Sequence, residues 1–133
     1  MTPGTEIDAL TAAVIGAAIE VHRELGPGYL ESVYEDALSV EFGLQRLAFE
    51  RQRPFSLNYK HKRVGEGRID FLVDSCLVVE IKAVERLQPI HKAQVMSYLK
   101  ATRCRIGLLI NFNEKMLKSG VQRIIWSDIV LVS

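Results

Sequence analysis

The stretch RIDFLVDSCLVVEIK, residues 68–82, decides the fold of this chain. Two short apolar segments separated by a polar turn are typical of a β-hairpin. Each segment also contains charge where a core strand is normally apolar: Asp70 in the first, Glu80 and Lys82 in the second. Because side chains alternate between the faces of a strand, Asp70 is expected on the face of Leu72. Ionised groups in a sheet core are costly unless they are paired or bind a metal, so the hairpin predicts a metal site.

The length of the hairpin turn decides whether the two carboxylates meet. Side chains alternate between the two faces of each strand. Asp70 and Glu80 therefore share a face only if the residue numbers of any two residues paired across the hairpin add to an even sum. A two-residue turn would pair Val73 with Cys76 and separate the carboxylates. We therefore predict a three-residue turn that pairs Val73 with Leu77, or else a bulge. That register places Asp70 directly opposite Glu80, close enough for both to bind one divalent cation.

Length and composition indicate an ordinary globular protein. The 133 residues are 48% apolar and 25% charged, with a net charge of +1, so we expect a single domain over residues 1–133 with one core. A nearly neutral chain has no strong global positive field, so any nucleic-acid contact would depend on local patches. Cys76 and Cys104 are expected to be reduced and buried. Neither a signal pattern nor a transmembrane run is present, which predicts a cytoplasmic protein without a membrane partner.

The remaining segments predict an α/β fold. Apolar spacing, caps and breakers give the order helix, helix, strand, hairpin, helix, strand. The expected ranges are 6–25 with Thr5 as N-cap, 30–42, 47–59, 68–82, 89–102 and 105–112, with short strands at 123–126 and 129–132. The buried side and edges of the third helix are expected at Ile90, Ala93, Met96, Leu99 and Lys100. The sheet would be central and mixed, an antiparallel meander followed by a helical crossover into a buried strand, with helices flanking it.

Several polar residues outside the hairpin are ambiguous when considered singly. Glu31 stands in a first helical turn, where the helix dipole favours acidic residues whatever their function. Gln94 and Tyr98 are four apart and share a helix face, as any flank pair would. His22 and His91 are kept as accessory candidates because each lies near another candidate in the sequence.

Basic and acidic surface groups also have two interpretations. The segment KHKR, residues 60–63, is either a solvated turn or a loop that contacts phosphate. The main basic candidates for nucleic-acid contact are Lys60, Lys62, Arg63 and Arg68. Further candidates, which could equally be ordinary surface charge, are Arg51, Arg53, Arg86 and Lys92. Glu35 and Asp36 are expected to be solvated on the outer side of their helix.

Taken together, these motifs resemble a known family. Asp70, the segment EIK at 80–82, and a helix with QVMSY at 94–98 resemble the PD-(D/E)XK nuclease superfamily, and QVMSY matches the QxxxY element of its helicase-associated exonuclease branch. The segment GYLESVY at 28–34 matches the signature of the GxxExxY family. One departure is Ile69, which stands where the superfamily name implies proline. Asp-x(n)-Glu-x-Lys alone is a weak pattern, but its combination with the other two motifs in this order is specific.

The resemblance implies a restriction-endonuclease-like core and Mg²⁺-dependent (or Mn²⁺-dependent) hydrolysis of phosphodiester bonds, with DNA favoured as the substrate. The implied metal ligands are Asp70, Glu80, the backbone carbonyl of Ile81, and Glu31 directly or through a water. The implied catalytic residues are Lys82, Gln94, Tyr98 and Glu31, with Lys82 orienting or deprotonating the attacking water. Oxygen donors of this kind are those that Mg²⁺ prefers.

Two other functions stay open from the sequence. One is a non-catalytic nucleic-acid-binding or regulatory module that keeps the fold. The other is a subunit whose activity needs a partner or a homodimer. The intact Asp70, Glu80 and Lys82 favour an active enzyme, because an inactive copy would tolerate neutral residues there.

Overall fold

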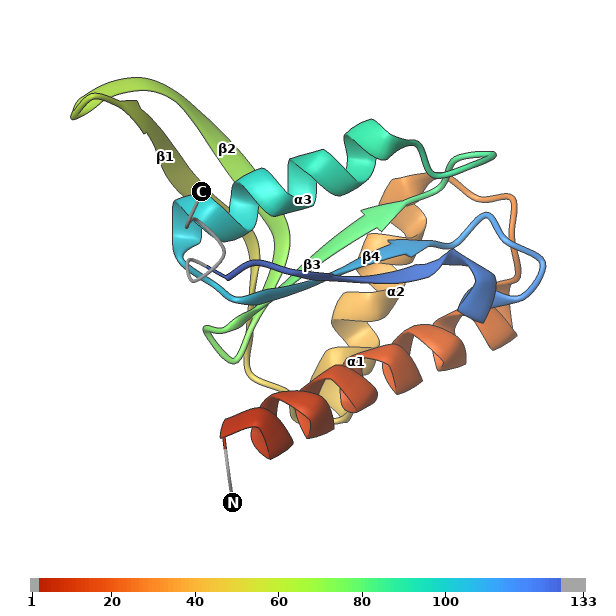
Figure 1. The fold of residues 1–133 in the computed structure, drawn as a ribbon. Coiled ribbons are helices and arrows are strands. Elements are labelled where there is room, and N and C mark those ends of the chain that lie inside the picture. The colour runs from red at the N-terminus through yellow and green to blue at the C-terminus, as the bar shows by residue number, and fades with distance from the viewer. Residues whose placement is uncertain (1–2, 128–133) are drawn as a thin grey trace.

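A five-stranded mixed sheet with helices on both faces forms the fold (Figure 1). The computed structural model describes residues 3–127, with side chains from Glu6 onward. The elements are α1 (Pro3–Leu25), α2 (Glu31–Leu44), β1 (Phe49–Tyr59), β2 (Lys62–Val73), β3 (Leu77–Lys82), α3 (Pro89–Thr102), β4 (Ile106–Asn111), the short 3₁₀ helix η1 (Leu117–Gly120) and β5 (Val121–Ile125). Strand order follows the sequence, and only β3 and β4 are parallel, joined by α3. This confirms the predicted α/β fold with a meander and a helical crossover; the expected strand at 129–132 lies outside the described residues.

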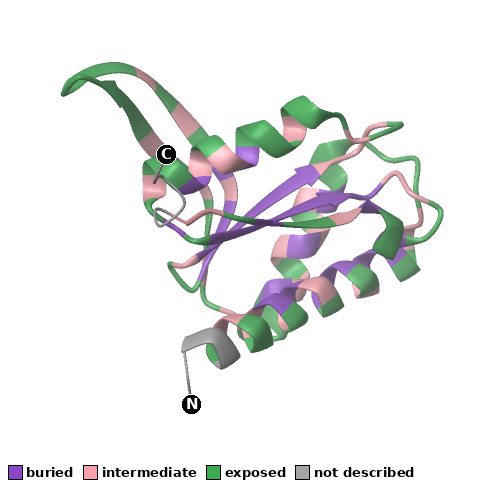
Figure 2. Ribbon diagram, in the orientation of Figure 1, coloured by how far each residue is buried: buried purple, intermediate pink, exposed green. Residues whose placement is uncertain are grey.

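The sheet separates two apolar cores, one under α1 and α2 and the other under α3. In β3, Leu77, Val79 and Ile81 pack into the first core, whereas Val78 packs into the second. The strand is therefore buried on both faces, as is β4 (Figure 2). Glu80 is thus placed at the centre of the protein, whereas Lys82 at the end of the strand is only half-buried.

The predicted hairpin register is confirmed. Val73 pairs with Leu77, and the intervening turn places Asp74 and Ser75 at φ 51° and 58°. The expected strict alternation is interrupted beside Asp70: Ile69 lies in the same core as Leu72, although three positions separate them. The alternation of side chains along β2 is therefore broken at Asp70, which is half-buried.

The buried face of α3 differs in part from the expected one. Leu99 is buried and Met96 packs against the second core, as expected. The other buried residue is Val95, whereas Ile90 is 70% exposed and Ala93 is also exposed. The reason is a close approach to β4, because a Cβ added at Gly107 would lie 2.9 Å from a Val95 methyl group. Because α3 contacts the sheet mainly over Gly107, only the narrow face of the helix that contains Val95 and Leu99 is buried.

Two local expectations, the N-cap of the first helix and the state of the cysteines, can be compared with the structure. Thr5 is not an N-cap, because α1 already begins at Pro3. Both cysteines are free, as expected, but Cys104 is buried while Cys76 is only half-buried. None of the described helices is both long and apolar enough to cross a bilayer.

The outer parts of β1 and β2 form a long hairpin arm, residues 53–68, that projects beyond the rest of the sheet (Figure 1). Pairing of β2 with β3 covers only residues 71–73, so the arm is a two-stranded ribbon along most of its length. Its tip is a two-residue turn, Lys60 and His61, at φ 49° and 67°. Near the base, the Phe55 ring meets the Tyr98 ring edge-on at 4.9 Å and ties the arm to α3.

Candidate active site

Asp70 and Glu80 lie together across the β2–β3 hairpin. The Asp70 backbone N–H donates to Glu80 Oε1 at 3.1 Å, and the Ile81 N–H donates to Asp70 Oδ2 at 2.8 Å. These reciprocal contacts continue the ladder beyond its last paired residues, Phe71 and Val79. The structure therefore brings the two carboxylates together as the register predicts.

Glu80 is an acid in an apolar setting. It is only 4% exposed, and burial together with the neighbouring charge of Asp70 raises its pKa from 4.5 to about 9. A hydrogen bond from the Asp70 backbone and the charge of Lys82 act in the opposite direction. Among the described residues, neither carboxylate forms an ion pair with Lys or Arg. A buried acid next to a half-buried one has a strong affinity for positive charge.

Lys82 and Glu31 lie at the edge of this pair. Lys82 ends β3, and its charge opposes the rise in pKa of both Glu80 and Glu31. Glu31 opens α2, and partial burial raises the pKa of its carboxyl, with a further contribution from Asp70. Residues from β2, β3 and α2 thus share one electrostatic environment.

A buried tyrosine fixes the turn that leads to Glu31. The Tyr34 hydroxyl donates to the Gly26 carbonyl at 2.6 Å and accepts from the Tyr29 N–H at 3.1 Å. Its ring stacks on Phe112 at 4.7 Å. Gly26 has φ 70°, a conformation that glycine adopts without strain. The sequence pattern from 28 to 34 therefore combines a site carboxylate with the anchor that positions it.

Helix α3 adds Tyr98 and Gln94 on the other side of the site. Burial raises the pKa of Tyr98, and the charges of Glu80 and Asp70 raise it further. A hydrogen bond with Gln94 has the opposite effect. The predicted pair on α3 is thus near the acid pair, with Gln94 more exposed than Tyr98.

The two histidines have structural partners instead. The buried His22 ring places Nε2 2.7 Å from the Glu114 carbonyl oxygen, which joins α1 to the loop after β4. His91 Nδ1 accepts the Gln88 N–H at 2.9 Å and completes the capping box of α3. The structure does not bring either histidine into the carboxylate cluster.

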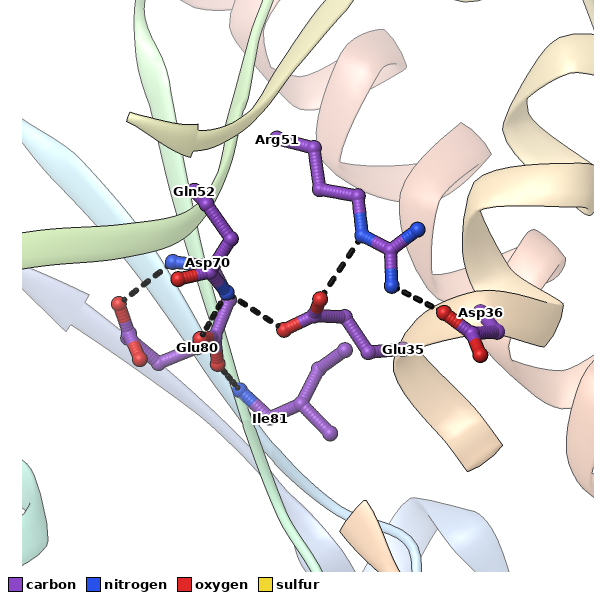
Figure 3. Close-up of polar contacts among 7 residues, drawn as sticks. All are labelled: Glu35, Asp36, Arg51, Gln52, Asp70, Glu80 and Ile81. Atoms are coloured by element: carbon purple, nitrogen blue, oxygen red, sulfur yellow. Dashed lines mark hydrogen bonds and ion pairs between the residues drawn. The ribbon is translucent and has the colours of Figure 1, made fainter. Parts of the chain in front are cut away.

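A second polar network connects α2 to the acid pair, and sequence reasoning missed it (Figure 3). Gln52 Nε2 donates to Glu35 Oε1 at 2.7 Å and to Asp70 Oδ1 at 3.2 Å. Arg51 Nε contacts Glu35 at 2.8 Å, and a second guanidinium nitrogen contacts Asp36. Glu35 is therefore not solvated as expected: its side chain is only 14% exposed. The available signal was its position one helical turn after Glu31, on the same face.

The end of β3 is held by a buried amide, which the sequence analysis also missed. Asn111 accepts the Val84 N–H at 3.0 Å and donates to the Val84 carbonyl at 2.9 Å. The Phe112 N–H donates to the Lys82 carbonyl at 2.9 Å. The backbone on both sides of Lys82 is therefore fixed by β4.

The donor set fits a hard divalent cation. Asp70 and Glu80 offer two converging carboxylates, and Mg²⁺ in proteins typically uses one or two of these with waters and phosphate oxygens. Within the described part of the chain, no three His, Cys, Asp or Glu side chains are gathered into a closed metal-binding group. Asp70 and Glu80 are therefore the two side chains that could hold such an ion directly.

The four main basic candidates lie on the hairpin arm. Lys60, Lys62 and Arg63 stand at or beside the exposed tip, and Arg63 is ion-paired with Glu66. Arg68 is exposed and lies two residues from Asp70. Positive charge is thus distributed from the tip of the arm towards the acid pair.

Comparison with known proteins agrees with this arrangement. A search of curated proteins gave no match. The family model of the PD-(D/E)XK nuclease superfamily matches residues 8–124. That range runs from within α1 to within β5 and includes every site residue described above. Nucleases of this superfamily generally use divalent metals, which agrees with the donor set. The chain therefore belongs to the PD-(D/E)XK nuclease superfamily.

Proposed function

We propose that this protein is a divalent-metal-dependent nuclease that hydrolyses phosphodiester bonds in DNA. The observation that supports this most is the buried Glu80 beside Asp70, with Lys82 completing the Asp…Glu-x-Lys pattern. Burying Glu80 beside the half-buried carboxylate of Asp70 is unfavourable for folding alone, so the arrangement is best explained by a bound cation. When bound, Mg²⁺ would acidify water and stabilise negative charge on the phosphate.

Each protein group then has a defined task. Asp70 and Glu80 hold the cation, assisted by the backbone carbonyl of Ile81. Lys82 lies beside the acids, where it orients the attacking water or exchanges its proton. Glu31 contributes a further carboxylate through a water. On α3, Gln94 and Tyr98 position the phosphate from the opposite side of the site. From the motif at residues 28–34, we also assign the chain to the GxxExxY branch of the superfamily.

The hairpin arm supports duplex DNA as the substrate. A two-stranded ribbon fits the major groove of B-DNA, which is about 12 Å wide. The exposed Lys60, Lys62 and Arg63 at its tip would contact phosphates, and Arg68 would do so near the acid pair. Arg63 is the weaker candidate because Glu66 already neutralises part of its charge.

Cleavage assays test the catalytic proposal. Wild type, Asp70→Asn and Lys82→Ala are incubated with duplex, single-stranded and branched DNA and with RNA, in Mg²⁺, Mn²⁺ or EDTA. We expect metal-dependent cutting of duplex DNA that both substitutions abolish. Cutting that survives Asp70→Asn would contradict the assignment. If wild type cuts nothing but gains activity with a partner or on dimerisation, a partner-dependent subunit is the correct description.

A turn replacement tests the arm separately. The double variant Lys60→Asn/His61→Gly places the residues that a type I′ turn prefers at φ 49° and 67°, so the hairpin is retained without the charge of Lys60. Duplex binding should weaken, and the salt slope should fall by about one, the contribution of one phosphate contact. Arg46→Asn is the matched control, a cation also at positive φ (59°) but at the end of α2. Equal losses in both variants would exclude the arm as a specific contact.

A further inference from the structure

We infer that Gln52 is a positioning residue for the metal-binding carboxylate of Asp70, and that it couples this carboxylate to helix α2. The inference rests on the proposed function, since it concerns the same cation site. Gln52 lies in β1, outside every motif of the superfamily that the sequence displays. Its side chain nevertheless reaches the centre of the site (Figure 3).

The contacts of its amide are specific. Gln52 Nε2 donates to Asp70 Oδ1 at 3.2 Å and to Glu35 Oε1 at 2.7 Å. An amide nitrogen has two hydrogens, so one is available for each carboxylate. The reverse orientation would place the amide oxygen against two acids, so the hydrogen-bond network itself fixes which end is nitrogen.

The backbone at Gln52 supports a functional interpretation. Gln52 has φ 54°, in the left-handed region that non-glycine residues adopt only with strain. It lies within β1 between Arg51 and Arg53, which pair with Phe71 and Ile69 on either side of Asp70. Strained residues of this kind cluster at functional sites, where the surrounding structure maintains them.

The network leaves Asp70 able to bind a cation. Oδ2 accepts the Ile81 N–H and Oδ1 accepts the Gln52 amide, so each oxygen keeps capacity for a metal. A lysine or arginine in place of Gln52 would neutralise the Asp70 carboxylate and compete with the cation. A neutral amide holds the carboxylate in place and leaves its negative charge available to the cation. This is the role that outer hydrogen-bond partners of metal ligands fulfil.

The same amide connects the sheet to α2. Glu35 lies one turn after Glu31, and Arg51 neutralises Glu35 from the other side at 2.8 Å. Glu35 is therefore fixed as an acceptor for Gln52 rather than being available to solvent. A shift of α2 relative to the sheet would break this link, so the network holds Glu31 and Asp70 in a constant relation.

The experiment compares Gln52→Gly with wild type in two measurements. Glycine adopts the left-handed backbone freely, so the strand keeps its shape while the amide is lost. Calorimetric titration with Mn²⁺ should show affinity reduced by roughly 10- to 100-fold, the range found when outer partners of metal ligands are removed. Urea denaturation in EDTA should show that the variant still unfolds cooperatively. Arg46→Gly, a glycine placed at φ 59° away from the site, is the matched control and should bind Mn²⁺ as wild type does.

A double-mutant cycle separates positioning from simple packing. If Gln52 acts with Glu35, the effects of Gln52→Gly and Glu35→Ala on Mn²⁺ affinity should not add, because both remove the same link. Wild-type affinity in Gln52→Gly, with or without a change in stability, overturns the inference while leaving the nuclease proposal intact. Absence of Mn²⁺ binding by wild type overturns both.

Discussion

Replacing the buried acid Glu80 by glutamine should stabilise the metal-free protein while abolishing its activity. Glu80 is almost fully buried beside Asp70, and its pKa is raised from 4.5 to about 9 by burial and by that neighbouring charge. At neutral pH the folded protein therefore retains the Glu80 proton, whereas the unfolded chain has released it. Glutamine has the shape of the protonated acid and has no proton to lose, so Glu80→Gln removes the penalty.

The size of the effect follows from the pH dependence. Because the folded pKa is the higher one, stability falls as pH rises from 4.5 to about 9. Neutral pH is about 2.5 pH units above 4.5, and each unit corresponds to about 1.4 kcal/mol. The variant should thus gain about 3 kcal/mol in free energy of unfolding at pH 7. The gain should be below about 1 kcal/mol at pH 5 and about 6 kcal/mol at pH 9.

Urea denaturation in EDTA at pH 5, 7 and 9 measures this difference directly. Groups that do not interact with Glu80 are common to both proteins, so subtracting wild type from Glu80→Gln leaves Glu80 together with its coupling to Asp70 and Tyr98. Glu24→Gln is the matched control on the exposed end of α1 and should change stability by less than about 0.5 kcal/mol at every pH. A Glu80→Gln variant no more stable than wild type at pH 9 would refute the reasoning, because Glu80 would then be stabilised as an anion within the fold.

Two further substitutions test the supports of the site. Tyr34→Phe removes two part-buried hydrogen bonds to the backbone. It should lower the free energy of unfolding by about 1–3 kcal/mol and reduce turnover by loosening the turn before Glu31. Wild-type stability and rate would contradict the anchoring role. Gly120→Ala would place its Cβ 2.4 Å from the Asn111 carbonyl oxygen and should lower the free energy of unfolding by about 1–3 kcal/mol. Gly43→Ala in α2 has open space and should instead be neutral or stabilising, as thermal denaturation would show.

The sequence predicted the arrangement of the two acids because side chains alternate between the faces of a strand with a period of two residues. The requirement that Asp70 and Glu80 face one another specified a three-residue turn, and Val73 does pair with Leu77. Helix ends were also predictable where local chemistry defines them, as at Pro89, which begins α3. These features depend on residues close together in the chain.

The features that the sequence did not predict depend on contacts between distant segments. The position of Glu35 on its helix predicted an acid exposed to solvent. Its partners in the structure, Arg51 and Gln52, come from β1, which is distant in the sequence. The buried stripe of α3 depends on Gly107, a residue of β4 whose missing side chain sets the distance between helix and sheet. Neither effect is encoded in the spacing of residues within one element.

Binding of Mn²⁺ tests the central claim most directly, because it requires no knowledge of the substrate. Calorimetric titration of wild type and Asp70→Asn at constant pH compares proteins that differ by one oxygen donor. We predict a saturable binding event in wild type that Asp70→Asn loses, since Asp70 and Glu80 form the only acid pair that β2 and β3 bring together in the described residues. Equal binding by both proteins, or none by wild type, would contradict the assignment of this hairpin as the metal centre of a nuclease.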